Sequence, residues 1–200
     1  MSSTVVNFGL LPPKRTVFLL CDIQDKYRPE AVYFNEIVES ASKLCQAAKI
    51  LDIPLLVTEQ KLETMGKTVS ELDISHAEGV YEKTKLSMLT PAVTEKLDSL
   101  CKGNVLCVVL FGLETHITIE QSAAELRALG LQVHVVADSC TSRTQEDRLL
   151  ALKRLQQIGC FITTTESVLF KCLADQENPN FTKIQSLLRS PISPTGLTSL

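Results

Sequence analysis

Polar side chains follow apolar runs at several points of the sequence, and their types can support acid–base or nucleophilic chemistry. The stretches are residues 21–25, 112–118 and 138–143, and a fourth polar stretch covers residues 82–88. In an open parallel sheet, ligands bind at the carboxyl ends of the strands, near the point where strand order reverses. We therefore look for the site residues in these four stretches.

Asp22 stands directly after the apolar run 16–21, so its carboxyl group is expected to emerge from the hydrophobic floor of a sheet. Removal from water raises the pKa of a carboxyl group unless a cation lies close by. Lys83 is a candidate for that cation, and an Asp with a raised pKa can act as a general acid. Two plainer interpretations stay open: an Asp that caps a turn and a Lys on a solvated surface.

The stretch 112–118 predicts a turn and a helix start behind the most apolar run of the chain. Backbone N–H groups at a helix start bind anions, so this turn can stabilise negative charge on a substrate. Taken alone, the same pattern is also typical of an ordinary helix-capping turn.

The elements that must position these residues alternate along the chain. Buried strands are predicted at 16–21, 54–57, 105–111, 132–137 and 160–163, with a short one near 79–81, and helices at 32–51, 90–100, 119–129, 144–158, 167–173 and 181–189. Apolar runs without polar alternation indicate strands covered on both faces. The pattern predicts a three-layer α/β/α fold, Rossmann-like and doubly wound, with a mainly parallel sheet of five or six strands.

One domain is expected, because 200 residues with 44% hydrophobic content can bury a sizeable core unaided. We assign 1–15 to an N-terminal arm, 16–190 to the domain and 191–200 to a C-terminal tail that is loose or docks on a neighbouring subunit. The stretch 59–88 lacks clear periodicity and is interpreted as an active-site loop.

Charge and cysteine content narrow the class of protein. A net charge of −3 without a dense basic cluster argues against nucleic acid as a partner, and the longest apolar run, 105–113, is too short to span a membrane. Seven cysteines without a C-x-x-C pair indicate reduced thiols and a cytoplasmic protein, with mitochondrial or nuclear locations left open. A mean hydropathy of +0.12 favours a homo-oligomer.

Five ordered motifs together resemble the isochorismatase-like cysteine hydrolases, and within them the animal isochorismatase domain-containing proteins, particularly the second paralogue type. The motifs are Asp22 with Gln24, residues 58–60, Lys83 with Ser87, residues 112–119 and residues 131–143. Each motif is weak alone, but their order and spacing match over about residues 16–190. The resemblance implies that this segment is an isochorismatase-like hydrolase domain acting on a small molecule.

The resemblance also implies roles for single residues. Asp22 corresponds to the general acid or base, Lys83 to the charge beside it, and Thr118 stands where the family has its cysteine nucleophile. A non-proline cis peptide is expected at Leu113–Glu114. The substrate and oxyanion contacts are expected from Gln24, Leu113, Glu114, Thr115, His116 and Ile117. The histidine pattern of the zinc-binding branch is absent, so we expect no metal and no cofactor.

Thr118 changes the chemistry that is available. A cysteine thiol differs from an ordinary Asp by roughly 4.6 pKa units, or about 6 kcal/mol, whereas a water-like hydroxyl differs by roughly 12 units, or about 16 kcal/mol. Asp22 is therefore a poor activator of Thr118. True isochorismatases have glycine there and protonate a vinyl ether instead, which Asp22 can do if its pKa is raised. Three hypotheses stay open: a hydrolase using Asp22, a weak or inactive binding member, and Thr118 as nucleophile through an unseen base.

Overall fold

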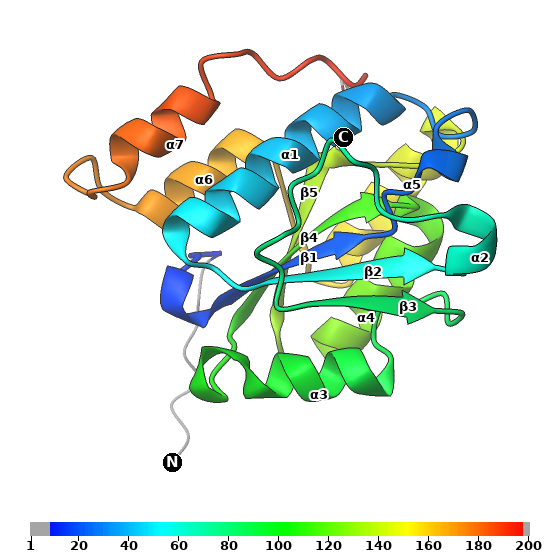
Figure 1. Ribbon diagram of the computed structural model, residues 1–200, viewed down its shortest axis with the longest axis horizontal. Coiled ribbons are helices and arrows are strands. Elements are labelled where there is room, and N and C mark those ends of the chain that lie inside the picture. Colours follow the sequence, from blue (N-terminus) through cyan, green and yellow to red (C-terminus); the bar gives the residue numbers. More distant parts are fainter. Residues whose placement is uncertain (1–8, 198–200) are drawn as a thin grey trace.

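The computed structural model describes residues 9–197 and contains a single sheet with helices on both faces (Figure 1). Its strands are β1 (Thr16–Cys21), β2 (Leu55–Gln60), β3 (Gly79–Lys83), β4 (Cys107–Leu113), β5 (Gln132–Thr141) and β6 (Phe161–Thr163). All neighbouring pairs are parallel, in the order β3-β2-β1-β4-β5-β6. The predicted doubly wound α/β fold is confirmed.

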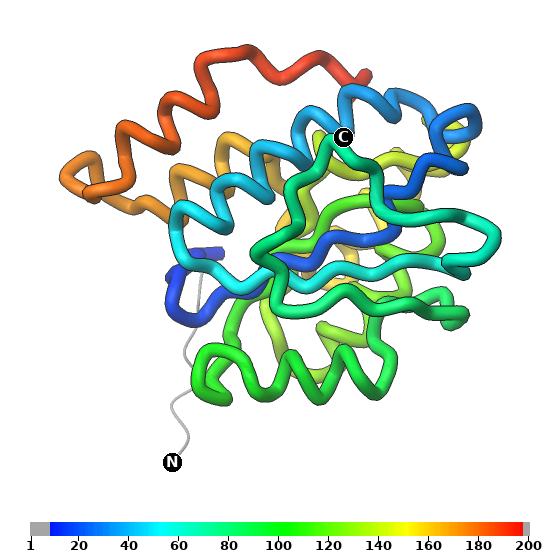
Figure 2. The backbone as a smooth tube through the Cα atoms, in the orientation of Figure 1, coloured from blue at the N-terminus to red at the C-terminus, as the bar shows by residue number. Residues whose placement is uncertain are grey.

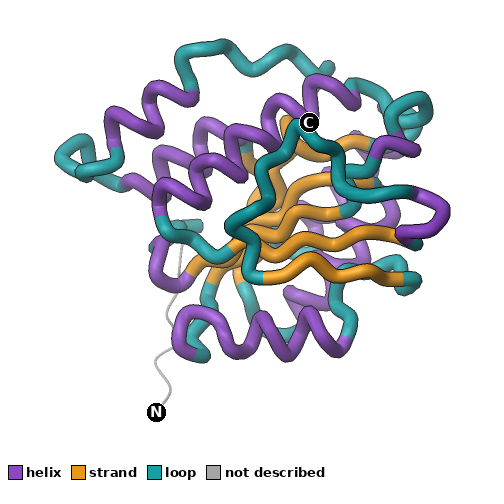
Figure 3. Tube along the Cα trace, viewed as in Figure 1, coloured by secondary structure: helices purple, strands orange, loops and turns teal. Residues whose placement is uncertain are grey.

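Two layers of helices cover this sheet. On one face lie α1 (Phe34–Leu51) and α6 (Thr165–Leu173), with α7 (Phe181–Leu187) packed outside against α1. The other face carries α3 (Pro91–Ser99), α4 (Glu120–Ala128) and α5 (Gln145–Gln157), and α2 (Leu62–Met65) is a single turn beyond β2. Figure 3 shows the strands between these helical layers.

The order of the strands places the site. From β1 the chain winds outward through β2 to β3, then returns to the other side of β1 as β4 and continues to β5 and β6. The direction of winding therefore reverses between β1 and β4, where the loops after the strands leave a place for ligands. Asp22 follows β1 and residue 114 follows β4, so both flank this reversal point.

The structure extends several strands beyond their predicted ends. β2 continues to Gln60, β3 to Lys83 and β5 to Thr141. The polar residues that continue β2 and β5 are buried, and several of their side chains find partners inside the fold. Stretch 59–88, expected to be a loop with one short strand, therefore contains the end of β2, the helix α2 and the whole of β3. Lys83 lies on a strand rather than in a polar loop.

The C-terminal tail also differs from expectation within the described residues. Residues 191–197 have no helix or strand but run alongside α1 in Figure 2, and Thr195 is buried. The carbonyl oxygen of Thr195 accepts a 2.6 Å hydrogen bond from Arg148, and that of Gly196 accepts one of 2.9 Å from Gln145. This part of the tail is held by the domain rather than loose, because its carbonyl groups pair with side chains of α5.

Among the described helices, none is both long and apolar enough to cross a membrane. Of the expected N-terminal arm, residues 1–8 lie outside the described part. Residues Pro13–Arg15 form a short 3₁₀ helix directly before β1.

Candidate functional site

Asp22 and Lys83 form a direct contact at the carboxyl edge of the sheet. Nζ of Lys83 lies 2.6 Å from Oδ2 of Asp22, and the two side chains are 0% and 1% exposed. Asp22 follows β1, whereas Lys83 ends β3, so the lysine side chain reaches across the intervening strand β2. A fully buried ion pair of this kind keeps both charges out of water.

Two residues of β2 complete the polar contacts of this pair. The hydroxyl group of Thr58 donates a 2.7 Å hydrogen bond to Oδ1 of Asp22. Oε1 of Gln60 accepts a 2.6 Å hydrogen bond from Lys83. Both residues belong to the 58–60 motif, although we did not predict this role for them. The signal was their position at the carboxyl end of the strand between the two charged residues.

Burial raises the pKa of Asp22 above its ordinary value, and this effect outweighs the opposing influence of Lys83 and Thr58. Tyr27, on the 3₁₀ turn Asp25–Tyr27, has a raised pKa through burial first and then through the charges of Asp22 and Glu114. Tyr27 is therefore a neutral phenol within electrostatic range of the acidic groups of the site. Nothing in the sequence marks it, because one tyrosine in a loop carries no pattern.

Gly112 allows β4 to come close to β1 beside the site. It has φ +123°, and a Cβ atom there would collide with the carbonyl oxygen of Cys21. The thiol of Cys21 donates to the carbonyl oxygen of Leu113 at 3.0 Å. The peptide bond between Leu113 and Glu114 is cis, as predicted. The residue before Asp22, Cys21, therefore contacts the end of β4 directly and holds Asp22 close to the turn that follows.

Thr118 lies in a π-helical turn, Thr115–Ile119, which precedes α4. The prediction placed the helix start here, whereas regular α-helix begins at Glu120. Thr118 is buried, and its carbonyl oxygen accepts a 2.6 Å hydrogen bond from Ser122. Ser122 also accepts a 2.8 Å hydrogen bond from the amide of Met88. Ser122 therefore links the segment after Lys83 to the turn that carries Thr118.

The neighbouring turn residues are held from the side of β5. The hydroxyl group of Thr115 donates to the carbonyl oxygen of Thr141 at 2.9 Å, and Nδ1 of His116 lies 2.9 Å from the hydroxyl oxygen of Ser142. Glu114 is half-buried, and burial is the main cause that raises its pKa. Its Oε1 atom is buried without a partner among the described residues.

Two of the expected substrate contacts are already engaged by the protein. The amide group of Gln24 donates to the carbonyl oxygens of Gln60 and Gly66, and its Oε1 accepts from the amide of Gln60. The backbone N–H of Ile117 donates to the carbonyl oxygen of Glu114 at 3.1 Å. Gln24 thus fixes the end of β2, and Ile117 offers no free amide. A direct role for the remaining turn amides stays a prediction.

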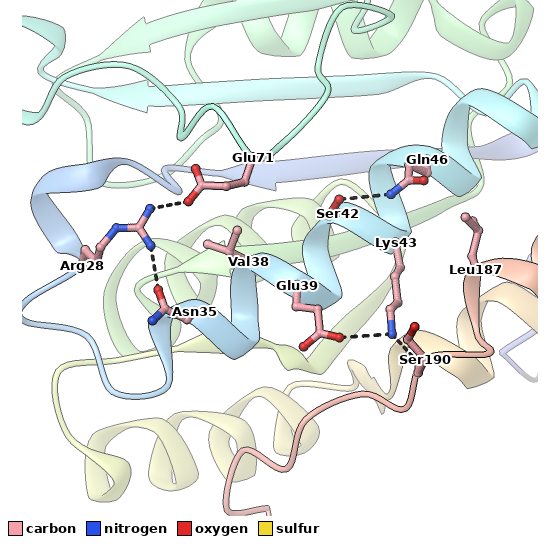
Figure 4. Close-up of a pocket in the computed structure, with 10 residues that line it drawn as sticks. All are labelled: Arg28, Asn35, Val38, Glu39, Ser42, Lys43, Gln46, Glu71, Leu187 and Ser190. Atoms are coloured by element: carbon pink, nitrogen blue, oxygen red, sulfur yellow. Dashed lines mark hydrogen bonds and ion pairs between the residues drawn. The ribbon is translucent and has the colours of Figure 1, made fainter.

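A groove of about 590 Å³ lies elsewhere, on the outer side of α1 (Figure 4). Its charged residues pair within or beside it: Arg28 with Glu71 at 2.8 Å, and Lys43 with Glu39 at 3.6 Å. None of the site residues lines it. We assign the chemistry to the edge of the sheet, where the buried charges and perturbed pKa values are found.

Within residues 9–197, no group of three or more His, Cys, Asp or Glu side chains is arranged to hold a metal ion. All seven cysteines are reduced thiols, and six of them are buried. Cys140, in the predicted polar stretch 138–143, is fully buried, and burial raises its pKa to about 12, so this thiol does not replace a nucleophile at position 118.

The fold and this site define a class: a doubly wound α/β protein with a buried Asp–Lys pair at the reversal point of its sheet. The Isochorismatase domain model matches residues 16–167. Isochorismatase domain-containing protein 1 of Salmo salar is 42% identical over 100% of this chain and 70% of its own length. Isochorismatase domain-containing protein 2 of Xenopus laevis is 43% identical, covering 99% and 95%.

Solved structures of similar proteins have the same fold. The MAR1 ribonuclease of Caenorhabditis elegans superposes with a TM-score of 0.90 at 34% identity, over 96% of this chain and 98% of that one. The YcaC protein of Escherichia coli, described as an octameric hydrolase of unknown specificity, has a TM-score of 0.79 at 19% identity, with 91% and 90% covered, and shows the fold alone. The chain belongs to the isochorismatase family.

Proposed function

We propose that this protein is a small-molecule hydrolase in which Asp22 is the general acid and base. The observation that carries the proposal is the buried contact between Asp22 and Lys83, beside the turn after β4. A buried carboxyl group with a raised pKa carries a proton closer to neutral pH than an exposed one does. Lys83 supplies the positive charge that stabilises the carboxylate after the proton has left.

The reaction that avoids a nucleophilic side chain is hydrolysis of a vinyl ether. The Asp22 carboxyl group donates its proton to the terminal carbon of the C=C bond, leaving a cation shared by the adjacent carbon and the ether oxygen. Water adds to that carbon and returns a proton to the carboxylate. The resulting hemiketal or hemiacetal then separates into a carbonyl compound and an alcohol. Thr118 needs no activation in this sequence, which fits its weakly acidic hydroxyl group.

Asp22→Asn tests the proposal on a panel of vinyl ethers and small amides. We expect a loss of about 100-fold to 10,000-fold in kcat/KM, because Asn cannot carry the transferred proton. Asp25→Asn is the matched control, since Asp25 lies three residues further on, is exposed and pairs with Arg28. Full activity in Asp22→Asn would disprove the proposal.

A second candidate function is binding without effective catalysis, and Thr118 is the observation that favours it. In this case the same edge of the sheet holds a metabolite, or the surface holds a protein partner. Thr118→Cys separates the two candidates. A binding member with an intact pocket gains amide hydrolysis or thiol labelling at residue 118, whereas the native protein shows no turnover on the panel.

RNA enters the same panel because the MAR1 relative is called a ribonuclease. A net charge of −3 without a dense basic cluster favours a small molecule over a polyanion in this chain. We therefore expect no cleavage of single-stranded RNA at physiological salt. Cleavage that Asp22→Asn abolishes would replace the vinyl ether with a phosphodiester as the substrate.

We also propose a homo-oligomer. The support is apolar side chains on the surface of the described part, among them Leu129, Leu150 and Ile158, which are 58%, 55% and 42% exposed. Size-exclusion chromatography with light scattering tests this: a mass near that of one 22.1 kDa chain would contradict it.

A reducing compartment, the cytoplasm, is the location we propose. Its support is seven cysteines in the reduced form, which persist as thiols where glutathione and thioredoxin keep them reduced. Microscopy of a fluorescent fusion checks this, and a signal confined to the oxidising secretory pathway would contradict it, whereas an additional mitochondrial or nuclear signal would not.

A further inference from the structure

The ammonium group of Lys83 has no hydrogen-bond donor left for a substrate. Nζ of Lys83 lies 2.6 Å from both Oδ2 of Asp22 and Oε1 of Gln60. It also lies 3.3 Å from the carbonyl oxygens of Lys85 and Leu86. These four acceptors occupy the three N–H groups of the ammonium. Lys83 acts on the reaction through Asp22 rather than by touching the substrate.

The two carboxyl oxygens of Asp22 are therefore not equivalent. Oδ2 lies against the cation of Lys83, so a proton on this oxygen would face an ammonium group at 2.6 Å. Oδ1 faces the neutral hydroxyl group of Thr58 at 2.7 Å. A hydroxyl group donates to one lone pair of a carboxyl oxygen and leaves a second position on that oxygen for a proton.

We propose that Oδ1 of Asp22 is the oxygen that carries the transferred proton, and that Thr58 is a positioning residue that fixes this oxygen. The inference rests on the proposed function, since it needs Asp22 as the acid. Thr58 holds Asp22 twice: its hydroxyl group donates to Oδ1, and its carbonyl oxygen accepts the Asp22 amide at 3.1 Å. The carboxyl plane is thus set by β2 on one side and by Lys83 on the other.

The titratable groups that face Asp22 come from three directions. Cys21 precedes it on β1, Lys83 reaches it from β3, and Tyr27 interacts with its charge from the turn after β1. Cys21 and Tyr27 have raised pKa values, so both are neutral at neutral pH. Lys83 is therefore the charge that acts directly on the carboxylate, and Thr58 is the stronger of two neutral donors, the weaker one being the thiol of Cys21.

Thr58→Val removes the hydroxyl group and keeps the branched shape that a strand favours. A hydrogen bond to the charged form holds the pKa of Asp22 down, so its removal should raise that pKa by about 1 unit. The pKa is read from the ¹³C carboxyl resonance of Asp22, assigned as the signal that Asp22→Asn lacks. The alkaline limb of kcat/KM should move upward by the same amount, since the acid keeps its proton to higher pH.

Two variants separate this role from a general effect on packing. Thr58→Ser keeps the donor and should retain the wild-type Asp22 pKa. Thr16→Val makes the same substitution at a fully buried threonine of β1, whose hydroxyl group donates to Pro12 instead, and should leave Asp22 unchanged.

The outcomes distinguish this inference from the proposed function. An unchanged Asp22 resonance titration in folded Thr58→Val, or an equal shift in Thr16→Val, overturns the inference whatever the activity. A shifted titration with an unshifted kcat/KM profile supports the contact between Thr58 and Oδ1 but refutes Asp22 as the acid. Failure of Thr58→Val to fold moves the test to Thr58→Ser, where a shift in the Asp22 titration comparable to the expected 1 unit overturns the inference.

Discussion

Two fully buried cations lie in different parts of the molecule and are neutralised in different ways. Lys83, at the edge strand β3, contacts the carboxylate of Asp22. Arg148, on α5, has no carboxylate within ion-pair distance among the described residues. Its guanidinium donates to the carbonyl oxygens of Ala137 and Thr195 at 2.7 and 2.6 Å, and to the hydroxyl group of Thr195 at 3.0 Å.

The difference teaches which buried charge can take part in chemistry. A carboxylate partner titrates, so the pair of Lys83 and Asp22 can gain or lose a proton and change its net charge. Carbonyl and hydroxyl groups do not titrate in this range, so the charge of Arg148 is fixed. The first arrangement suits an active site, whereas the second holds chain segments together: β5, α5 and the C-terminal tail.

Lys83→Met should produce the largest loss of stability in this comparison. It leaves the Asp22 carboxylate buried without a cation, which costs about 3–5 kcal/mol of unfolding free energy at pH 7. The folded-state pKa of Asp22 then lies further above its unfolded value, so the loss is smallest near pH 4 and grows as the pH rises. Urea denaturation at pH 4, 5.5 and 7 measures it.

Lys85→Met is the control for that variant, because Lys85 is half-exposed and pairs with the exposed Glu125. Its expected cost is below about 1 kcal/mol. If Lys83→Met lowers the unfolding free energy equally at pH 4, 5.5 and 7, the idea that its partner Asp22 titrates is contradicted.

Arg148→Met should cost about 3 kcal/mol, because it leaves two buried carbonyl groups unpaired and releases the tail. No hydrogen-bond partner of Arg148 titrates, and Asp138 acts on its charge only from beyond ion-pair distance, so the loss should change little between pH 5.5 and pH 7. Denaturation at both values checks this, with Arg143→Met as the exposed control, since the Arg143 side chain is 61% exposed. A loss in Arg148→Met that changes by half between the two values would show that a titrating group lies against the guanidinium.

His134 extends the comparison to a buried basic group with no partner. Both ring nitrogens lack a hydrogen-bond partner within the described part, the ring stacks on Phe161 at 4.7 Å, and burial lowers its pKa to about 4. The unfolded chain binds a proton below about pH 6.5 and the folded one does not, so stability is present above that pH and falls as the pH drops. Between pH 7 and pH 5 the loss from this group is about 2 kcal/mol.

His134→Phe removes this proton linkage while keeping an aromatic ring against Phe161. The difference in unfolding free energy between variant and wild type should therefore change by about 2 kcal/mol between pH 7 and pH 5, in favour of the variant at pH 5. An equal difference in unfolding free energy between variant and wild type at pH 7 and pH 5 would show that His134 does not resist protonation in the fold.

The sequence was sufficient for the class of fold, and the family resemblance supplied the pairing of Asp22 with Lys83. Apolar runs predicted β1, β2, β4, β5 and β6, whereas β3 was expected only as a short strand inside a loop. The carboxylate could be found because it directly follows a buried strand. Lys83 was found through its motif, since its strand was predicted to end before it.

Other parts could not be predicted because their partners are backbone groups. Arg148 pairs with carbonyl oxygens, and every residue has one, so nothing in the sequence marks Ala137 or Thr195 as its partner. The link that Ser122 makes between Met88 and Thr118 could not be predicted for the same reason, because both of its partners are backbone groups. The π-helical turn was missed, since the periodicity of α4 fixes a helix but not the geometry of its first residues.

The way the tail is held matters for anyone who shortens or labels this chain. The family model matches the chain only as far as residue 167, and the pattern of elements suggests a boundary at 190. A protein truncated at either point would lose Thr195 and leave a guanidinium group to fill its hydrogen bonds with water inside the fold. An affinity tag is therefore better placed ahead of residue 1, and a preparation cut near residue 190 should be screened for aggregation before its inactivity is attributed to Thr118.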